Sequence, residues 1–481
     1  MTAPHRLIDA VRAALGERSL TTDADRIAPW LVDWRGRFRG SAAAMLLPAS
    51  TDEVAAMVRL AREHRVPLVP QGGNTSMVGG ATPPADGSAL LLSTRRLDRI
   101  RQLDPASGLA VAEAGVILQT LHERAGEAGC RFPLTLGSRG SATIGGLVST
   151  NAGGTQVLRW GTMRRLVAGI EAVLPDGQVH DGLTPLPKDN RGYDLDQLLV
   201  GAEGTLGIVT AATLRLAPAI LGRAVAWVGI ADPEAGLALL RRMQAVTEAV
   251  ESFEIIPGDT LGRALCYLPD ARAPLESTHR WHLLIEAVAT SADADAPDAL
   301  LTRLLGEALE TGLAADAVIA ASEAQAEAFW RLRDSLSAAE RAAGPAVQHD
   351  ISVPVDRMPR FMVEAADAAE ARFPGTHATA FGHLGDGNVH FHVRAPDGAD
   401  PVRWMGEAAP GITAFVHDLV VAAGGSISAE HGIGQMKRDE LARLGPPARL
   451  AALRAIKSGL DPMNLFNPGK LVTLAPADGA K

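Results

Sequence analysis

The pattern of apolar and polar residues predicts that the chain begins as an α+β domain. Residues 51–64 place four apolar side chains at helical spacing behind Thr51, which predicts a helix with Thr51 as its cap. The run VPLVP at 66–70 follows at once, and its continuous apolar character indicates a short buried strand. A helix followed closely by a buried strand is typical of an α+β unit.

Further strands are predicted between residues 88 and 181. SALLLST at 88–94 and GLAVAEA at 108–114 are short apolar runs of strand length. In EAVLPDGQVHD at 171–181, the pair Asp176-Gly177 predicts a hairpin turn between two strands.

The pattern changes near Ala217. AVAWVGI at 224–230 predicts a strand, PEAGLALLRRMQAV at 233–246 a helix, and HLLIEAVA at 282–289 another strand. This alternation indicates an antiparallel sheet covered by helices. We expect two domains and a disordered tail, at 1–217, 218–470 and 471–481.

Composition favours a soluble enzyme. The 481 residues suffice for two or three domains, and a net charge of -9 argues against nucleic acid or an anionic membrane as partner. No apolar run approaches the length of a membrane span, and the amphipathic start is interrupted by charge, unlike a signal peptide. The cysteines, Cys130 and Cys266, are too few for a disulfide framework and suit a reducing compartment. We therefore expect a cytoplasmic protein without a transmembrane segment.

Three histidines lie close together in GHLGDGNVHFH, residues 382–392. Its turn-forming LGDGN predicts a tight loop that delivers His383 from one strand end and His390 from the next. On the second strand His390 and His392 share a face, while the alternating Val389, Phe391 and Val393 face the core.

SAEHG, at 428–432, adds Glu430 and His431 to this set. Two imidazoles and one carboxylate, with one position left for water or substrate, have the composition of a catalytic zinc-type site. The alternative is that these are core or loop histidines with satisfied hydrogen bonds. Three imidazoles in so short a segment would be an unusual way to build a core.

Glycine is concentrated in three stretches of the first half, at 70–83, 137–154 and 201–210. The first follows a strand but precedes no helical pattern, so it is not the G-x-G-x-x-G turn of a Rossmann phosphate site. Its paired glycines bracket polar residues 74–76, giving a loop whose amides and hydroxyls can wrap an anion. Three such loops indicate a long ligand, such as a dinucleotide with a pyrophosphate.

A possible carboxylate clamp lies on a helix predicted near residue 333. Arg333 and Ser337 are four residues apart and so face the same way. A guanidinium binds a carboxylate through two hydrogen bonds, and a hydroxyl one turn away can add a third. The alternative is a solvated surface arginine, and Arg331 and Arg341 are assigned to the surface.

Eight motifs together resemble a known family. They are PQGGNT, TIGG, NAGG, KDNRGYDL, GAEGTLGI, GHLGDGN, SAEHGIG and FNPGK, and they span roughly residues 34 to 470. In this order they resemble the FAD-dependent 2-hydroxy acid dehydrogenases of the vanillyl-alcohol oxidase type, in the branch of D-2-hydroxyglutarate dehydrogenase, D-lactate dehydrogenase and the glycolate oxidase flavoprotein subunit. The resemblance implies an α+β FAD-binding domain with two subdomains, followed by a C-terminal substrate domain of antiparallel sheet and helices.

The implied cofactor is FAD. Binding is expected to be non-covalent, because the PQGGNT loop has no histidine or cysteine to form a flavin linkage. Asn467 is expected to reach back to the flavin, although a turn residue before Pro468 is the alternative. The expected FAD-binding residues are Pro70, Gly72, Gly73, Asn74, Thr75, Gly79, Gly80, Leu136, Gly137, Ser138, Ser141, Thr143, Gly145, Gly146, Ser149, Asn151, Gly153, Gly154, Gly161, Glu203, Gly204, Gly207, Ile208, Val209 and Asn467.

The implied reaction is oxidation of a D-2-hydroxy acid to the 2-oxo acid, with hydride transfer to flavin N5. Zn²⁺ or another divalent metal would activate the substrate hydroxyl, and His431 would act as general base. Arg333 would hold the C1 carboxylate. The expected metal ligands are His383, His390 and Glu430, and the expected substrate-binding residues are Arg333, Ser337, Gln348, His392 and His431.

The chain departs from the hydroxyglutarate-specific pattern at three positions. It has Ser337 for a threonine, Gln348 for a lysine and His392 for an asparagine. Losing an ammonium removes a charge-assisted hydrogen bond worth roughly 1.5 to 3 kcal/mol, unless protonated His392 compensates. We expect a preference shifted toward monocarboxylates such as D-lactate or larger apolar D-2-hydroxy acids, and D-2-hydroxyglutarate itself is the alternative.

Two other classes of function remain. A non-catalytic flavoprotein subunit would be expected to lose the histidine and Glu430 cluster, and a metallohydrolase would leave the glycine loops without a purpose. The expected partners are a small 2-hydroxy acid and an electron acceptor such as electron-transfer flavoprotein or a quinone, with a homodimer possible. Sequence does not decide between oxidase and dehydrogenase, and the family favours dehydrogenase.

Overall fold

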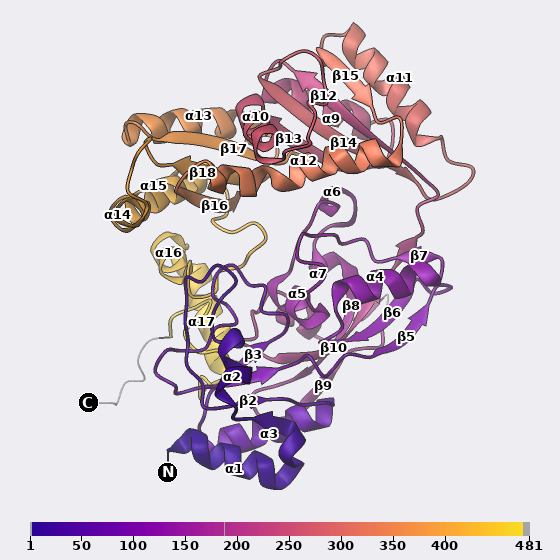
Figure 1. Cartoon of the computed structure of the whole chain (residues 1–481). Helices are drawn as coiled ribbons and strands as arrows, with labels where there is room; N and C mark the ends of the chain where they lie inside the picture. Colours follow the sequence, from indigo (N-terminus) through magenta and orange to yellow (C-terminus); the bar gives the residue numbers. More distant parts are fainter. Residues whose placement is uncertain (1, 187, 475–481) are drawn as a thin grey trace. The chain divides into compact units, whose positions relative to one another are not determined.

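The computed structural model describes residues 2–186 and 188–474 and divides into two compact units (Figure 1). Unit 1 comprises Met1–Gly153, Gly161–Pro218 and Glu430–Lys481, and unit 2 comprises Gly154–Trp160 and Ala219–Ala429. The segment after Ala429 thus belongs to unit 1, and the domain limits at 217 and 470 stay predictions. Most of the predicted tail, residues 475–481, lies outside the described residues.

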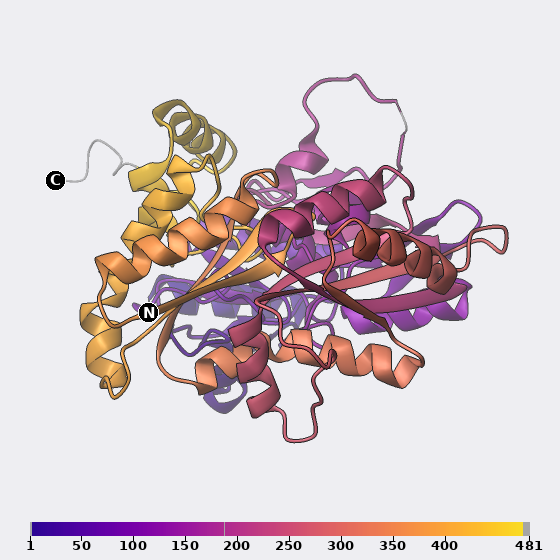
Figure 2. The same cartoon turned by 90° about the horizontal axis from the view of Figure 1, so that it is seen from above.

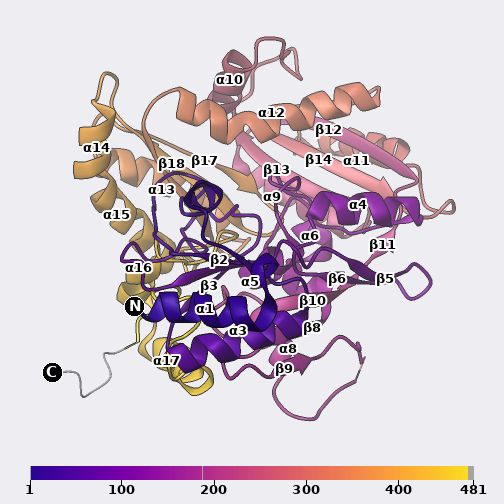
Figure 3. The ribbon, with the colours of Figure 1, turned by 60° about the horizontal axis from the view of Figure 1, so that its bottom comes forward.

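The first sheet of unit 1 has the strand order β1-β2-β4-β3, in which β2, β4 and β3 run parallel. Its strands are β1 (Leu20–Thr21), β2 (Met45–Leu46), β3 (Leu68–Gln71) and β4 (Leu90–Ser93). Helices α1 (Ala3–Leu15) and α3 (Thr51–His64) lie side by side against it (Figure 3). The predicted helix is confirmed, but Thr51 as its cap is wrong. Ser50 accepts the amide hydrogen bond of Glu53, while the Thr51 hydroxyl donates to Glu171.

The second sheet of unit 1 is antiparallel, with the order β5-β6-β10-β8-β9. Its strands are β5 (Ile100–Asp104), β6 (Leu109–Glu113), β8 (Val167–Val173), β9 (Val179–Asp181) and β10 (Ile208–Arg215). The predicted hairpin at Asp176-Gly177 is confirmed. Gly177 has φ of 82°, and its amide donates to the Leu174 carbonyl at 2.9 Å.

The remaining elements of unit 1 are helices, 3-10 turns and one strand pair. They are 3-10 turns at Glu17–Ser19 and Ala28–Trp30, helices α2 (Ala24–Ile27), α4 (Leu118–Glu127), α5 (Ile144–Thr150), α7 (Met163–Leu166), α8 (Leu195–Leu199), α16 (Arg438–Leu444) and α17 (Pro447–Leu460), and the pair β7 (Cys130–Arg131) and β11 (Ala217–Pro218).

The last segment of the chain joins the first sheet of unit 1. Phe466 forms a parallel bridge with Leu68 of β3. The buried Lys457 ammonium donates to the carbonyl oxygens of Thr205 at 2.8 Å and Phe466 at 2.9 Å, and it pairs with Asp461. One lysine therefore ties the C-terminal segment to the third glycine stretch.

Unit 2 is built on one seven-stranded antiparallel sheet with the order β15-β12-β14-β13-β17-β18-β16. The predicted antiparallel sheet covered by helices is thus confirmed. Its strands are β12 (Gly222–Ile230), β13 (Val250–Pro257), β14 (Trp281–Ala289), β15 (Asp316–Ile319), β16 (Ala346–Ser352), β17 (His377–His383) and β18 (Asn388–Arg394).

Helices cover the two faces of this sheet differently. One face carries the main core of unit 2, under α9 (Pro233–Gln244), α11 (Pro297–Glu310), α13 (Met358–Arg372) and α15 (Ala409–Ala422). The other packs against α10 (Gly258–Tyr267) and α12 (Glu323–Ala342). Figure 2 shows the orange strands β17 and β18 with α13 beside them. The remaining helices of unit 2 are α6 (Val157–Trp160) and α14 (Pro401–Glu407).

The predicted hairpin of the histidine segment is confirmed as β17 and β18, with His383 opposite Asn388. Val389, Phe391 and Val393 are fully buried in the main core, so the alternation of faces is also confirmed. Within residues 2–186 and 188–474, no helix combines the length and the apolarity needed to cross a membrane.

Candidate functional site

In unit 1 the first glycine stretch packs closely on the second. A Cβ at Gly72 would lie 2.1 Å from Thr143 Oγ1, and one at Gly73 would lie 1.8 Å from the Ser141 carbonyl oxygen, so neither position has room for a side chain. The prediction that the whole second stretch forms a loop is wrong, because α5 occupies its centre. Apolar Ile144, Leu147 and Val148 at helical spacing were the signal for that helix.

The third glycine stretch is tied to the SAEHGIG segment. Glu203 has φ of 52° and is followed by Gly204 at 68°, which turns the carboxylate inward. That carboxylate accepts hydrogen bonds from the amides of Ile433 and Gly434, both at 2.7 Å. Burial raises the pKa of Glu203, while the two amides and the charge of Lys437 oppose the rise.

Asn467 joins the first and third stretches. Its side-chain amide donates to the carbonyl oxygens of Gly80 at 2.8 Å and Glu203 at 2.7 Å. The side-chain oxygen of Asn467 is buried and has no hydrogen-bond partner in the part of the chain that is described. Nearby Lys470 is 3% exposed, and burial lowers its pKa to about 8.

These loops fit a large polar ligand. Among the described residues, Thr143 Oγ1 and Gln71 Oε1 are also buried without hydrogen-bond partners, so the stretches offer unsatisfied polar atoms beside close-packed glycines. Of the predicted FAD-binding residues, all lie in unit 1 except Gly154, which belongs to unit 2. Cys130 is unsuited to a flavin linkage, because its thiol donates to the Ala125 carbonyl and burial raises its pKa.

In unit 2 the second face of the sheet becomes polar at β17, β18 and β16. Gln348, His392 and Thr379 lie opposite one another across these three strands, and so do Asp350, His390 and Phe381. The ring centroids of His390 and His392 lie 5.3 and 5.1 Å from that of Phe381. The hairpin therefore presents its imidazoles on one face around an aromatic ring.

His383 is held by two charged neighbours. Its Nδ1 lies 2.6 Å from Glu254 Oε1, and Arg333 Nη2 lies 3.2 and 3.1 Å from its Nδ1 and Nε2. Burial alone would lower the pKa of His383, but the Glu254 charge raises it to about 9. The centroid of the His390 ring lies 5.5 Å from that of His383.

The surroundings of His383 share one feature with those of a metal-ligating histidine. A ligating histidine commonly donates its other ring N–H to a carboxylate, which is the relation of His383 Nδ1 to Glu254. A metal at Nε2 would replace the proton that the ring otherwise holds there.

The predicted substrate residues also gather in unit 2, apart from His431. Arg333 is largely buried on α12 and pairs with Glu254, and Ser337 follows one turn later. Gln348 lies opposite His392, and its side-chain nitrogen is buried without a hydrogen-bond partner among the described residues. Arg331 and Arg341 are exposed, as predicted.

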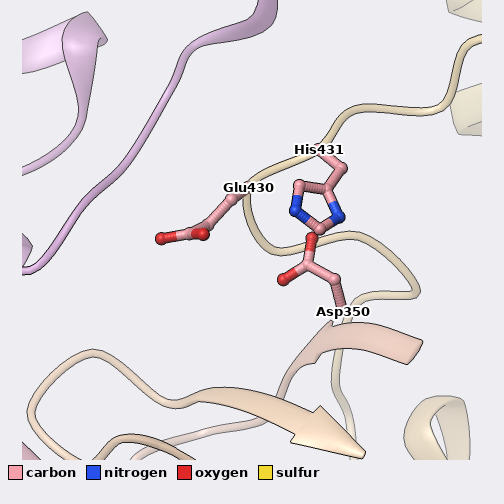
Figure 4. Close-up of side chains that lie close together, drawn as sticks. All are labelled: Asp350, Glu430 and His431. Atoms are coloured by element: carbon pink, nitrogen blue, oxygen red, sulfur yellow. The ribbon is translucent and has the colours of Figure 1, made fainter. Parts of the chain in front are cut away.

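Glu430 and His431 open the last segment of unit 1. Figure 4 draws them with Asp350, which stands on β16 of unit 2, and all three offer metal-ligand atoms. Asp350 is buried and accepts a hydrogen bond from the side-chain amide of Asn388 at 3.0 Å. The grouping of Glu430 with His383 and His390 stays a prediction.

Glu254 and Asp350 were not among the predicted site residues. Glu254 lies in VESFEIIP, a strand that is buried throughout and mostly apolar, and the buried Asp350 lies in AVQHDIS, which is only partly buried. A carboxylate at such a position needs a charged partner, and this was the one signal available. The sequence could not name the partner.

Two family models match the chain. One described as "FAD binding domain" matches residues 42–182, and one described as "FAD linked oxidases, C-terminal domain" matches residues 222–471. The first covers the first two glycine stretches, and the second covers the histidine hairpin and the SAEHGIG segment.

Curated relatives match over nearly the whole chain. D-2-hydroxyglutarate dehydrogenase, mitochondrial, from Arabidopsis thaliana is 35% identical over 95% of this chain and 80% of its own length. The protein of the same name from Bos taurus is 36% identical over 94% and 80%, and D-2-hydroxyglutarate dehydrogenase from Stutzerimonas stutzeri is 34% identical over 98% and 99%.

Solved structures share the fold. A crystal structure of p-cresol methylhydroxylase with substrate bound aligns with a TM-score of 0.74 and 16% identity, covering 97% of this chain and 96% of that one. An alkyldihydroxyacetonephosphate synthase aligns with a TM-score of 0.73 and 15% identity, covering 96% and 86%.

The relatives' names correct the predicted cytoplasmic location. Those from Arabidopsis thaliana, Bos taurus and Rattus norvegicus are named mitochondrial, whereas the Stutzerimonas stutzeri name gives no compartment. The prediction failed because two free cysteines suit any reducing compartment, so cysteine usage could not distinguish one from another.

Proposed function

The chain belongs to the family of FAD-linked D-2-hydroxyglutarate dehydrogenases and is a D-2-hydroxy acid dehydrogenase, and from this premise we propose how its own residues work and which acid it prefers. FAD when bound accepts the hydride from C2 of the substrate. We assign its binding to the three glycine stretches and Asn467 of unit 1.

FAD binding is proposed to be non-covalent. The loops offer amides and hydroxyls, and Cys130, which lies on β7 outside these loops, already donates its thiol hydrogen bond to the Ala125 carbonyl. Acid precipitation of the purified protein should therefore release all the yellow colour into the supernatant. Colour that stays with the pellet would show a covalent link.

We propose that histidines hold the metal and remove the substrate proton. His383 and His390, with Glu430, would hold a divalent metal, most suitably zinc because two imidazoles and one carboxylate suit that ion. The metal when bound lowers the pKa of the substrate hydroxyl. His431 would take the hydroxyl proton, and the Arg333 guanidinium would hold the C1 carboxylate.

The proposal on substrate preference rests on Gln348. Its buried side-chain nitrogen has no hydrogen-bond partner in residues 2–186 and 188–474, and it lies opposite His392 on the polar face. A neutral amide there gives a weaker contact to a second carboxylate than an ammonium does. We infer a preference for monocarboxylates such as D-lactate or larger apolar D-2-hydroxy acids.

The test compares catalytic efficiency on D-lactate, D-2-hydroxybutyrate, D-malate and D-2-hydroxyglutarate with an artificial dye as electron acceptor. The proposal expects the monocarboxylates to lead. A preference for D-2-hydroxyglutarate by two orders of magnitude would overturn it.

D-2-hydroxyglutarate is the second candidate substrate, because it is the acid named in the relatives that span nearly the whole chain. In that case His392, protonated, would supply the positive charge that Gln348 lacks. An optimum for D-2-hydroxyglutarate that disappears when the pH rises above the pKa of an imidazole would support this candidate. The electron acceptor is proposed to be an electron-transfer flavoprotein or a quinone, rather than oxygen.

A further inference from the structure

Glu254 has no part in the function proposed above, yet it contacts two residues that do. It stands on β13, next to β17 in the sheet, and its side chain is 1% exposed. Oε1 lies 2.6 Å from His383 Nδ1, while Oε2 lies 2.9 Å from Arg333 Nε and 2.8 Å from Arg333 Nη2. Each carboxylate oxygen therefore serves a different partner.

The two contacts have different consequences for the partners. A carboxylate at Nδ1 fixes the orientation and tautomer of an imidazole, so Nε2, which lies 3.1 Å from Arg333 Nη2, is the atom that would bind the metal proposed above. Two hydrogen bonds from one guanidinium fix the plane of the arginine. The third nitrogen, Nη1, lies 3.8 Å from Asp334 Oδ1 and is the one that would bind the substrate carboxylate in the function proposed above.

We propose that Glu254 is the positioning residue shared by His383 and Arg333, and that it couples metal retention to binding of the substrate carboxylate. This inference rests on the proposed function, since it takes His383 as a metal ligand and Arg333 as the carboxylate clamp. It adds a residue that the sequence motifs did not single out.

A second buried carboxylate of the same sheet provides a matched control. Glu286 on β14 is also largely buried, pairs with Arg223 at 2.9 Å and accepts a hydrogen bond from Trp330 Nε1 at 2.7 Å. Its partners include none of the proposed metal or substrate residues. A purely structural role of a buried ion pair should therefore appear equally in Glu254→Gln and Glu286→Gln.

The experiment uses the full-length protein loaded with FAD. Bound zinc is measured after dialysis against graded chelator, and the Kd of oxalate, a dicarboxylate that is not oxidised, is measured from the flavin difference spectrum. In Glu254→Gln the zinc affinity should fall about tenfold to a hundredfold, because a ligand's supporting carboxylate is lost. The Kd of oxalate should rise by a similar factor, while FAD content and both values in Glu286→Gln stay native.

Glu254→Asp covers the case in which Glu254→Gln does not fold. It keeps the charge but is one methylene shorter, so it cannot hold both partners, and both affinities should weaken severalfold. Native values for zinc and oxalate in whichever variant folds would overturn the inference. A native enzyme that binds no zinc and turns over fully in chelator would instead overturn the proposed metal role.

Discussion

At β16, β17 and β18 the two faces of the seven-stranded sheet in unit 2 have opposite chemistry. On one face Val389, Phe391 and Val393 are fully buried under helices in the main core. On the other, the same hairpin presents His383, His390 and His392. Because side chains alternate along a strand, one strand can supply both core and site. The packed face therefore holds the polar face in position.

The largest expected effect comes from replacing a histidine of the polar face, and a histidine of the apolar face provides the control. His390→Ala should lower turnover roughly a thousandfold, because the metal proposed at this residue would contribute several kcal/mol to charge stabilisation and each 1.4 kcal/mol is tenfold. The flavin spectrum should stay native. Turnover is measured with a dye acceptor.

His349→Gln is the control on the apolar face. His349 stands on β16, is buried and lies 3.1 Å through Nδ1 from the Phe391 carbonyl oxygen. This variant should lose stability and keep its turnover per folded molecule. Equal losses of turnover in both variants would mean that the faces are not functionally distinct.

The next largest effect is expected from a substitution on the core face, which should lower the stability of the protein rather than its turnover. Phe391→Ala removes a fully buried ring and should cost about 3 to 5 kcal/mol of unfolding free energy. Urea denaturation of unit 2 measures this. At low urea the remaining folded enzyme should keep kcat within a few-fold of native, and a loss like that of His390→Ala would contradict the separation of faces.

The apolar half of the second face contains His282, and its role can be tested through the pH dependence of stability. Burial lowers its pKa to about 4, and Trp227 Nε1 donates to its Nδ1 at 3.2 Å. The fold favours the neutral ring, so its contribution is complete above the unfolded pKa of about 6.5 and is lost as pH falls toward 4. We expect a loss on the order of 3 kcal/mol over that window. Denaturation of His282→Gln across the same window should lack this slope.

The smallest expected effect is a change of specificity. Gln348→Lys should raise catalytic efficiency on D-2-hydroxyglutarate about tenfold to a hundredfold, because an added charge-assisted hydrogen bond is worth roughly 1.5 to 3 kcal/mol. Efficiency on D-lactate should change little. If neither substrate responds, Gln348 does not contact the distal end of the acid.

Local patterns predicted those parts of the fold that depend on neighbours in sequence. The hairpin of His383 and His390 followed from turn residues and period-two alternation, and the helix predicted near Arg333 is α12. Ser50 was missed as a cap because Ser50 and Thr51 are both good caps and adjacent.

Glu254 and Asp350 could not be found in the same way. Glu254 meets His383 because β13 pairs with β17, a contact between residues 129 positions apart. Asp350 faces His390 because β16 pairs with β18. The order of strands in a sheet is set by tertiary packing, and no local pattern in the sequence specifies it.

The bonds of the last segment set an order of events during synthesis. Leu68 donates its amide to Leu465, and the buried Glu203 carboxylate receives the amides of Ile433 and Gly434. A nascent chain that has not reached those residues leaves Glu203 without its donors and β3 without its neighbour. Unit 2, whose main segment ends at Ala429, can fold while still on the ribosome. Completion of unit 1 is then a later step than the folding of unit 2, because it waits for the segment that carries residues 433, 434 and 465.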